Sequence, residues 1–340
     1  MQLGLIFTGG DLRVAQLADL AGSAEASGFS QLAVAEAWRS AWVPLTAMAA
    51  ATRRIRLGPY VLNAYGRSPL LAGMAAVDFN EFSAGRLVLG VGGGNRLINE
   101  QWQGTPHVRV LTKMREYVTL MQRIARTGAG ERLLFTGEIH QMDWCPAVSP
   151  AAIPYPVVLA AVFPQMMRVA AQVADGIGAG ATLSPAYITD VLKPRAASAA
   201  DSVDRNPANL AWTAVAITAV AADREAARRA AREAICHLYA PLPHPYYEYT
   251  MREQGFGTVA DRLLELMPAG ELERAIAAIP DECIDQLTIA GTLAECRKKI
   301  ADYHDLVDTL LLLNAMGVSG NDIDGAYGEL LKLPRGPAAG

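Results

Sequence analysis

The sequence predicts an α/β protein, a single (β/α)8 TIM barrel over residues 1–335, from three observations. Short apolar runs alternate with longer Ala-rich segments of helical period along most of the chain. The apolar runs show no polar alternation, which is typical of parallel strands covered by helices. The first run is followed by Thr8-Gly9-Gly10-Asp11 rather than Gly-x-Gly-x-x-Gly, which favours a closed barrel over an open dinucleotide-binding sheet.

Eight strand–helix units make up the predicted barrel. Each strand is a run of aliphatic residues, and the strands are expected at 2–7, 31–36, 55–62, 86–91, 156–162, 176–179, 210–220 and 307–314. The helices are expected at 12–27, 43–52, from 69 onward, and at 112–126, 164–173, 185–200, 223–239 and 321–333. Proline stands at the start of three of these helices, where its missing N–H is well tolerated.

Two segments interrupt the alternation. Residues 133–142 read LLFTGEIHQM, two short strands around a Thr-Gly turn, which predicts a hairpin insertion near 133–148. Residues 240–282 contain no strand-like run and begin APLPHPYYEY, which predicts a helical lid insertion. A further helix is expected near 293–303, before the last strand.

The composition excludes several function classes. Lys and Arg number 30 against 34 Asp and Glu, so we expect no nucleic-acid partner. The longest apolar run, 210–222, is shorter than the roughly 20 residues that cross a bilayer, and MQLGLIF lacks the basic start of a signal peptide. The cysteines are scattered without metal-ligand spacing, so a cytoplasmic protein with reduced thiols and no metal site is expected.

Functional residues of a barrel lie at the carboxyl ends of its strands. Glu36 ends the second strand, and spacing leaves two interpretations open, a ligand-orienting carboxylate or a helix-capping, salt-bridging one. Gly92-Gly93-Gly94-Asn95 follows the fourth strand and is interpreted as a backbone surface for a flat or phosphorylated ligand, or as a tight turn. Gly58-Pro59 interrupts the third strand, which indicates a bulge or simply the strand's end.

Aromatic residues near the strand ends are interpreted either as the lining of an apolar mouth that stacks a planar ring or as core. They are Trp38, Trp42, Tyr60, Tyr65 and Phe163. The five histidines show no pairing pattern and are expected on the surface or in loops.

Three segments together resemble the bacterial luciferase-like superfamily. They read AEASGFSQLAVAEAW at 24–38, LTAMAAATRRIRLGPYVLNAYGRSP at 45–69 and AAVDFNEFSAGRLVLGVGGGN at 75–95. The hairpin segment, PVVLAAVFPQMMRVAAQVADGI and DQLTIAGTLAECRKKIADY extend the likeness over most of the chain. Within the superfamily the chain resembles the deazaflavin branch, which includes methylene-tetrahydromethanopterin reductases and sugar-phosphate dehydrogenases that use coenzyme F420.

The resemblance implies a dimeric barrel that binds its deazaflavin at the carboxyl mouth, and a cis peptide bond at Tyr60–Val61. Homodimers would pair through the Ala-rich helices near strands one to four. The positions that match the cofactor site are Glu36, Tyr60, Val61, Asn63, Gly93, Gly94, Asn95, Val162 and Phe163.

Three departures prevent either named activity from being carried over. Ala37 replaces a histidine and Asn95 replaces a glutamate of the sugar-phosphate dehydrogenases, and Ile6 replaces a glutamate of the methanopterin reductases. The proton would then come from Thr8, Glu36, the substrate or water.

Three functions follow from the resemblance. The first is an F420-dependent oxidoreductase that moves hydride between the deazaflavin and a small organic substrate. The alternatives are an FMN-dependent luciferase-like monooxygenase, whose cofactor a reductase partner would supply, and a non-catalytic flavin-binding barrel.

Overall fold

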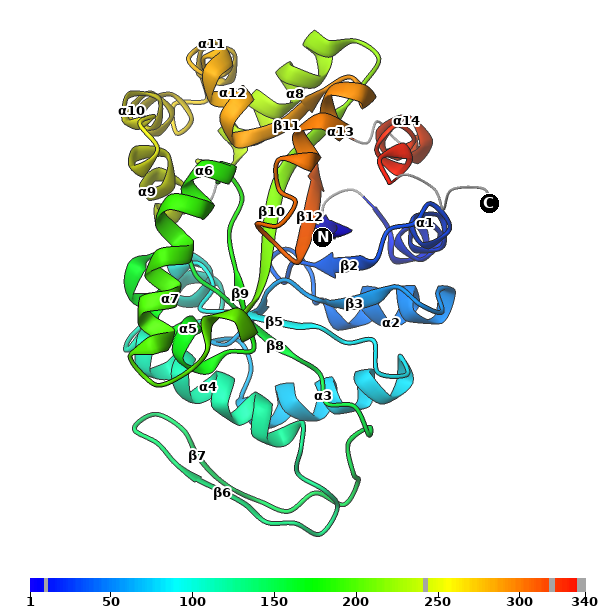
Figure 1. Ribbon diagram of the computed structural model, residues 1–340, viewed down its shortest axis with the longest axis vertical. Helices are drawn as coiled ribbons and strands as arrows, with labels where there is room; N and C mark the ends of the chain where they lie inside the picture. Colours follow the sequence, from blue (N-terminus) through cyan, green and yellow to red (C-terminus); the bar gives the residue numbers. More distant parts are fainter. Residues whose placement is uncertain (9–11, 241–243, 318–321, 335–340) are drawn as a thin grey trace.

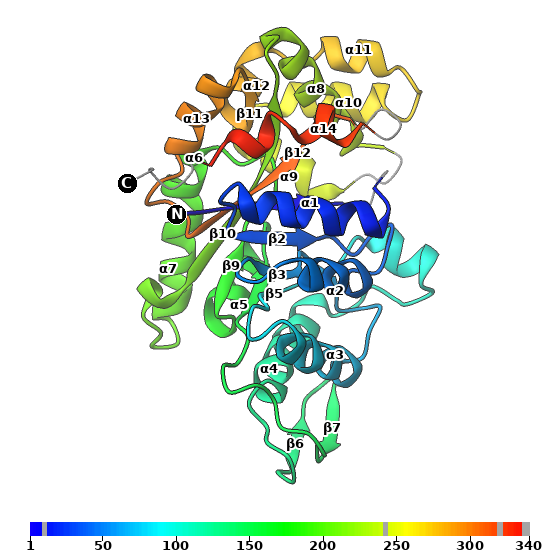
Figure 2. The same ribbon diagram turned by 90° about the vertical axis from the view of Figure 1, so that its right-hand side faces the viewer.

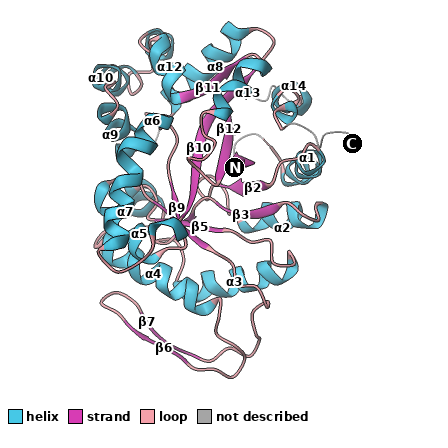
Figure 3. Ribbon diagram, viewed as in Figure 1, coloured by secondary structure: helices cyan, strands magenta, loops and turns pink. Residues whose placement is uncertain are grey.

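The computed structural model describes residues 1–8, 12–240, 244–317 and 322–334. A parallel sheet at its centre curls into a barrel, and helices surround it (Figures 1 and 3). The strand order is β3-β2-β1-β12-β10-β9-β8-β5-β4. The bounds of these strands are β1 (Gln2–Phe7), β2 (Gln31–Val34), β3 (Arg56–Pro59), β4 (Leu62–Asn63), β5 (Leu89–Gly92), β8 (Val157–Ala160), β9 (Gly176–Gly178), β10 (Ala211–Val220) and β12 (Thr309–Asn314).

Each strand position around the barrel is called a stave. The third stave consists of β3 and β4, which stand at opposite ends of the strand order, so the barrel nearly closes there. β3 pairs with β2, and β4, which follows after a two-residue break, pairs with β5. A parallel bridge between Leu57 and Leu87 joins the same two staves. Gly58 permits this close seam, since a Cβ there would overlap the carbonyl oxygen of Val88. The predicted fold class is therefore confirmed.

Helices pack against the outside of the staves, as a second view shows (Figure 2). α1 illustrates why they form there, because its buried residues Leu17, Leu20, Ala21 and Ala24 share one helical face. The barrel helices are α1 (Val14–Ala26), α2 (Trp42–Ala51), α3 (Pro69–Phe82), α4 (Val110–Ile124), α5 (Pro164–Val173), α6 (Pro185–Tyr187), α7 (Lys193–Asp201), α8 (Arg224–His237), α13 (Leu293–Ala301) and α14 (Ile323–Tyr327).

The predicted hairpin is present and projects from the barrel (Figure 1). It pairs β6 (Leu133–Thr136) with β7 (Gln141–Trp144). The buried carboxylate of Glu116 in α4 fixes its turn by accepting hydrogen bonds from the backbone N–H of Glu138 (2.6 Å) and His140 (2.8 Å). Burial alone would raise the pKa of Glu116, but these donors and that of Ile139 outweigh it and hold the pKa below its ordinary value.

Helices occupy the predicted lid region, of which residues 241–243 lie outside the described chain. They are α9 (Pro245–Glu253), α10 (Gly257–Leu266), α11 (Leu272–Ala277) and α12 (Asp281–Leu287). A strand that we did not predict, β11 (Thr288–Gly291), follows them and pairs with the last four residues of β10. Because β11 has only four residues and directly follows a helix, its pairing with distant β10, not a local pattern, makes it a strand.

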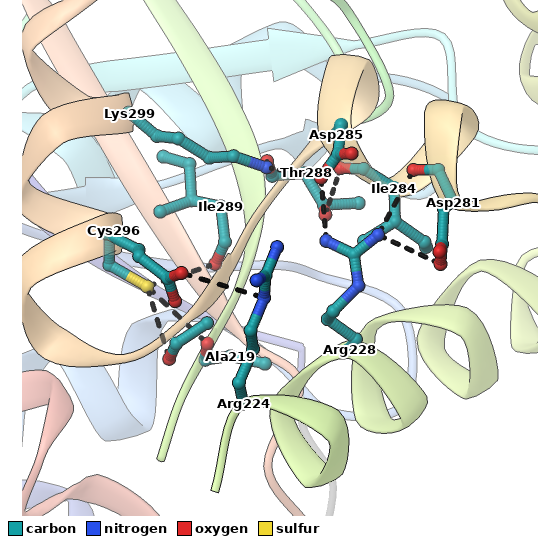
Figure 4. Close-up of polar contacts among 12 residues, drawn as sticks. Ala219, Arg224, Arg228, Asp281, Ile284, Asp285, Thr288, Ile289, Cys296 and Lys299 are labelled. Carbon is teal, nitrogen blue, oxygen red and sulfur yellow. Dashed lines mark hydrogen bonds and ion pairs between the residues drawn. The ribbon is translucent and has the colours of Figure 1, made fainter. Parts of the chain in front are cut away.

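Arg228 of α8 joins the last lid helix to the barrel (Figure 4). Its guanidinium is 3% exposed and pairs with Asp281 (2.9 Å) and Asp285 (2.6 Å) of α12. Lys299 of α13 reaches Asp285 (3.5 Å) and donates to the carbonyl of Thr288 (3.3 Å). These ion pairs connect three helices around β11.

Several predicted elements have other bounds in the structure. The third strand, expected at 55–62, is divided into β3 and β4, and a π-helix at Ile188–Leu192 divides the helix expected at 185–200 into α6 and α7. The second strand ends at Val34, so Glu36 lies in the loop beyond it. The last helix, expected at 321–333, is divided into α14 and a 3-10 turn at Leu330–Lys332, and residue 321 lies outside the described chain. A carboxylate explains where α14 starts, because Asp322 Oδ1 accepts a hydrogen bond from the N–H of Gly325 (2.8 Å).

Among the described helices, none combines the length and apolar character that crossing a membrane requires. The described residues also hold no cluster of three or more His, Cys, Asp or Glu side chains placed for a metal ion. Cys145 is exposed, whereas Cys236, Cys283 and Cys296 are buried, and all four are free thiols.

Candidate functional site

Glu36 lies at the carboxyl end of the barrel and ties the second stave to the third. Its backbone N–H donates to the carbonyl of Val61 (3.3 Å), and its carboxylate accepts from the backbone N–H of Asn63 (3.3 Å). Arg67 Nη2 pairs with Glu36 Oε1 at 2.8 Å. The Glu36 side chain is only 13% exposed. Glu36 therefore forms the ion pair that the salt-bridging interpretation predicted, and its ligand-orienting role stays a prediction.

Asn99 is the centre of a buried polar network beside Glu36. Its Oδ1 accepts from Asn63 Nδ2 (2.8 Å), and its Nδ2 donates to the carbonyl of Gly93 (2.7 Å) and lies 2.7 Å from His107 Nδ1. Since Nδ2 can only donate, His107 Nδ1 accepts and the ring proton is on Nε2. Burial also lowers the pKa of His107, which favours the neutral imidazole.

The glycine loop after β5 packs directly on this network. Gly94 has φ +66°, and a Cβ there would lie 2.6 Å from Asn63 Nδ2, so the position requires glycine twice over. Gly93 supplies the carbonyl that Asn99 holds. Asn95 is buried, and its side chain accepts from the N–H of Leu97 (2.8 Å). The prediction that this loop and the second-strand carboxylate share one mouth is confirmed.

The Tyr60 side chain extends from the third stave to the sixth stave, which is β9. The Tyr60–Val61 peptide bond is cis, as predicted. The Tyr60 hydroxyl donates to the carbonyl of Ala179 (3.0 Å), and a Cβ at Gly178 would lie 2.6 Å from that hydroxyl oxygen. Burial raises the pKa of Tyr60, so the hydroxyl stays protonated.

Val162 and Phe163 lie beneath the lid helix α9. A Cβ added at Gly180 would meet both Val162 Cγ2 (3.4 Å) and the ring of Tyr246 (3.5 Å). The Phe163 ring lies 5.1 Å from that of Tyr249, measured between centroids. Phe163 also precedes α5, whose first turn receives no side-chain cap. Pro164 at the first position has no N–H, and the N–H groups that follow it in that turn can face an anion.

Thr8 directly follows β1 and is exposed, at the same end of the barrel as Glu36; its neighbours 9–11 lie outside the described residues. Sequence reasoning missed Arg67, Asn99 and His107. The spacing could have indicated Asn99, because it stands four residues after Asn95 and would lie on the same face of a helix that starts there. Nothing local distinguished Arg67 or His107.

Together these contacts build a mouth from the ends of five staves. It offers backbone at a glycine loop, a buried hydroxyl and amide network, and an uncapped helix N-terminus. Such an arrangement suits a flat ring carrying a phosphate group, which agrees with the ligand chemistry expected at the glycine loop.

Comparison with known proteins identifies relatives along nearly the whole chain. The family model for luciferase-like monooxygenases matches residues 4–310. A putative coenzyme F420-dependent oxidoreductase of Mycobacterium tuberculosis is 27% identical over 322 residues, 88% of this chain and 90% of that protein. A 5,10-methylenetetrahydromethanopterin reductase of Archaeoglobus fulgidus is 29% identical over 296 residues, 86% of each. The solved F420-dependent tetrahydromethanopterin reductase of Methanopyrus kandleri has the same fold, with a TM-score of 0.81 at 20% identity over 97% of each chain.

Proposed function

Because the chain belongs to the luciferase-like monooxygenase family, we propose that it is a coenzyme F420-dependent oxidoreductase. It would move a hydride between the deazaflavin and a small organic substrate. The observation that carries the choice of cofactor is the likeness, over 88% of the chain, to a relative named for F420. The site network supports it, since the same mouth holds every residue that was predicted to contact the deazaflavin.

The residues present fit this cofactor. The backbone of Gly93 and Gly94 and the Tyr60–Val61 segment would hold the deazaflavin ring. The N–H groups at the start of α5, after Val162 and Phe163, would hold the phosphate, because the positive end of a helix dipole attracts anions. Asn63 and Asn95 would act by holding the loop, since the side chain of each is engaged with backbone.

The cofactor supplies the hydride chemistry, and the chain supplies orientation and exclusion of water. A proton must accompany the hydride, and Thr8 and Glu36 are the proposed groups. Because Glu36 is already paired with Arg67, we propose Thr8 as the relay from water. Glu36 is then a positioning residue that fixes Asn63 and the third stave.

Titration of the purified protein with F420 and, separately, with FMN tests the choice of cofactor. Tryptophan fluorescence reports binding, and we expect the dissociation constant for F420 to be the lower one. Equal or tighter binding of FMN, with oxygen consumption when reduced FMN is supplied, would instead indicate the monooxygenase and its reductase partner. Binding of FMN without oxygen consumption would indicate the non-catalytic flavin-binding barrel, and failure to bind either cofactor would contradict all three functions.

A homodimer is also proposed. Val43 of α2 and Leu71, Met74 and Phe82 of α3 are exposed apolar side chains, and these two helices lie next to each other (Figure 2). Covering such a surface with a second copy would remove apolar area from water.

A further inference from the structure

Two indole rings meet at the mouth, and the cofactor site does not account for them. Trp38 lies in the loop after β2, and Trp102 ends the π-helix Ile98–Trp102 after β5. Their ring centroids are 4.9 Å apart at an interplanar angle of 54°. Trp38 follows Glu36 by two residues and Trp102 follows Asn99 by three, so the pair lies beside the buried network.

Both indoles remain open to solvent. Trp38 is 59% exposed and Trp102 is 46% exposed. Trp42, at the end of the same loop, packs instead against Phe79 at 5.6 Å. An indole buries a large apolar surface when it finds a partner. Two exposed rings in contact with each other therefore form an apolar patch, whereas single exposed apolar residues need no explanation.

Charged side chains on the segments that carry the two indoles already have partners. Arg67 pairs with Glu36 (2.8 Å), and Arg96 pairs with Glu100 (3.0 Å). Arg39, next to Trp38, donates to the carbonyl of Leu12 (2.7 Å). The patch thus presents aromatic faces beside side chains whose charges are ion-paired or hydrogen-bonded, which suits an uncharged ligand better than an anionic one.

We propose that Trp38 and Trp102 form a substrate shelf that selects planar, uncharged aromatic or conjugated compounds. This assignment rests on the proposed function, since it places the substrate at the mouth where the cofactor binds. Because both indoles are exposed to solvent, a flat ligand would stack on one ring and contact the other. A saturated ligand of similar size cannot stack in this way.

Calorimetric titration with 2-acetylnaphthalene tests the shelf, and its fully saturated decalin analogue is the matched ligand. We expect the wild-type protein to prefer the planar ketone. Trp38→Ala and Trp102→Ala should each raise its dissociation constant roughly tenfold, about 1.4 kcal/mol. Trp38→Phe should retain most of the affinity, and Leu134→Ala, an exposed apolar residue of the hairpin, should retain all of it.

F420 affinity is measured for the same variants and should be unchanged. Unaltered ketone binding in both alanine variants, or equal binding of the saturated analogue, would refute the shelf. The shelf would also be refuted if the alanine variants changed oligomeric state in light scattering but kept their affinity for the ketone. The two indoles would then form a contact between copies of the chain. If no variant, including wild type, binds F420, the proposed function fails, while the ketone titration still decides the shelf.

Discussion

Asn63 donates a hydrogen bond from Nδ2 to Asn99 Oδ1 at 2.8 Å, and both side chains are buried. This contact joins the third stave to the loop after the fourth across 36 residues of sequence. Because Asn99 also holds the carbonyl of Gly93, the glycine loop cannot move without breaking buried hydrogen bonds. The mouth is thereby shaped before any ligand arrives.

Asn99→Ala should destabilise the protein by about 1–3 kcal/mol, because it removes the hydrogen-bond partner of buried Asn63 and of the partly buried Gly93 and His107. Urea denaturation measures the loss. Asn209→Ala, at an exposed position, is the control and should change the free energy of unfolding by less than about 0.5 kcal/mol. Equal stability of the two variants would show that the network is not maintained in solution.

Gly94→Ala should cost more than Gly104→Ala. Both glycines have positive φ, +66° and +63°, but only at Gly94 would a Cβ collide with Asn63, whereas nothing lies within 4 Å of the position at Gly104. We expect about 1 kcal/mol from the backbone alone at Gly104, and a larger loss together with weaker F420 binding at Gly94. Thermal denaturation and F420 titration compare them, and identical behaviour would contradict the close packing.

Acidification should release the hairpin turn. The pKa of Glu116 is lower in the folded protein than its unfolded value of 4.5. Its carboxylate therefore stabilises the fold at pH values above 4.5. This contribution disappears as the pH falls through the lower folded pKa. Hydrogen exchange at the amides of Glu138 and His140, corrected for its intrinsic pH dependence, should show protection falling below about pH 4.5. Glu116→Gln should reduce this pH dependence, and exposed Glu138→Gln should preserve it. A pH-independent wild type would refute the account.

Arg228→Ala should lower the free energy of unfolding by about 2 kcal/mol. Its buried guanidinium has two carboxylate partners, but both of these are themselves exposed and regain water, so the loss is below the 3–5 kcal/mol of fully buried pairs. Arg229→Ala next to it removes an exposed pair with Glu273 and should cost less than about 1 kcal/mol. Denaturation curves measure both losses. Equal losses in the two variants would show that the Arg228 contacts stabilise the protein no more than an exposed ion pair does.

Light scattering at micromolar concentration should show a homodimer. Leu71→Lys, which puts a charge into the apolar surface on α3, should shift the protein toward monomer. Leu134→Lys on the hairpin should leave the mass unchanged. A monomeric wild type would end the dimer proposal and leave the apolar side chains of α2 and α3 unexplained.

Local patterns predicted the barrel because strands buried on both faces read as uninterrupted apolar runs, and helices read as longer segments with one apolar face. They also located the strand ends approximately, and with them Glu36, Asn63 and the glycine loop. They failed at β11, whose four residues become a strand only by pairing with β10, and at the last helix, which is divided in two.

By itself, the sequence determined the architecture and the end of the barrel at which the site lies. Only the tertiary structure decided which side chains meet there. Arg67 pairs with Glu36, which is 31 residues away in the sequence. Trp102 contacts Trp38, although the two residues lie in different loops. Such pairs depend on the register and closure of the staves, which is a property of the whole sheet, whereas apolar periodicity is a property of each segment alone.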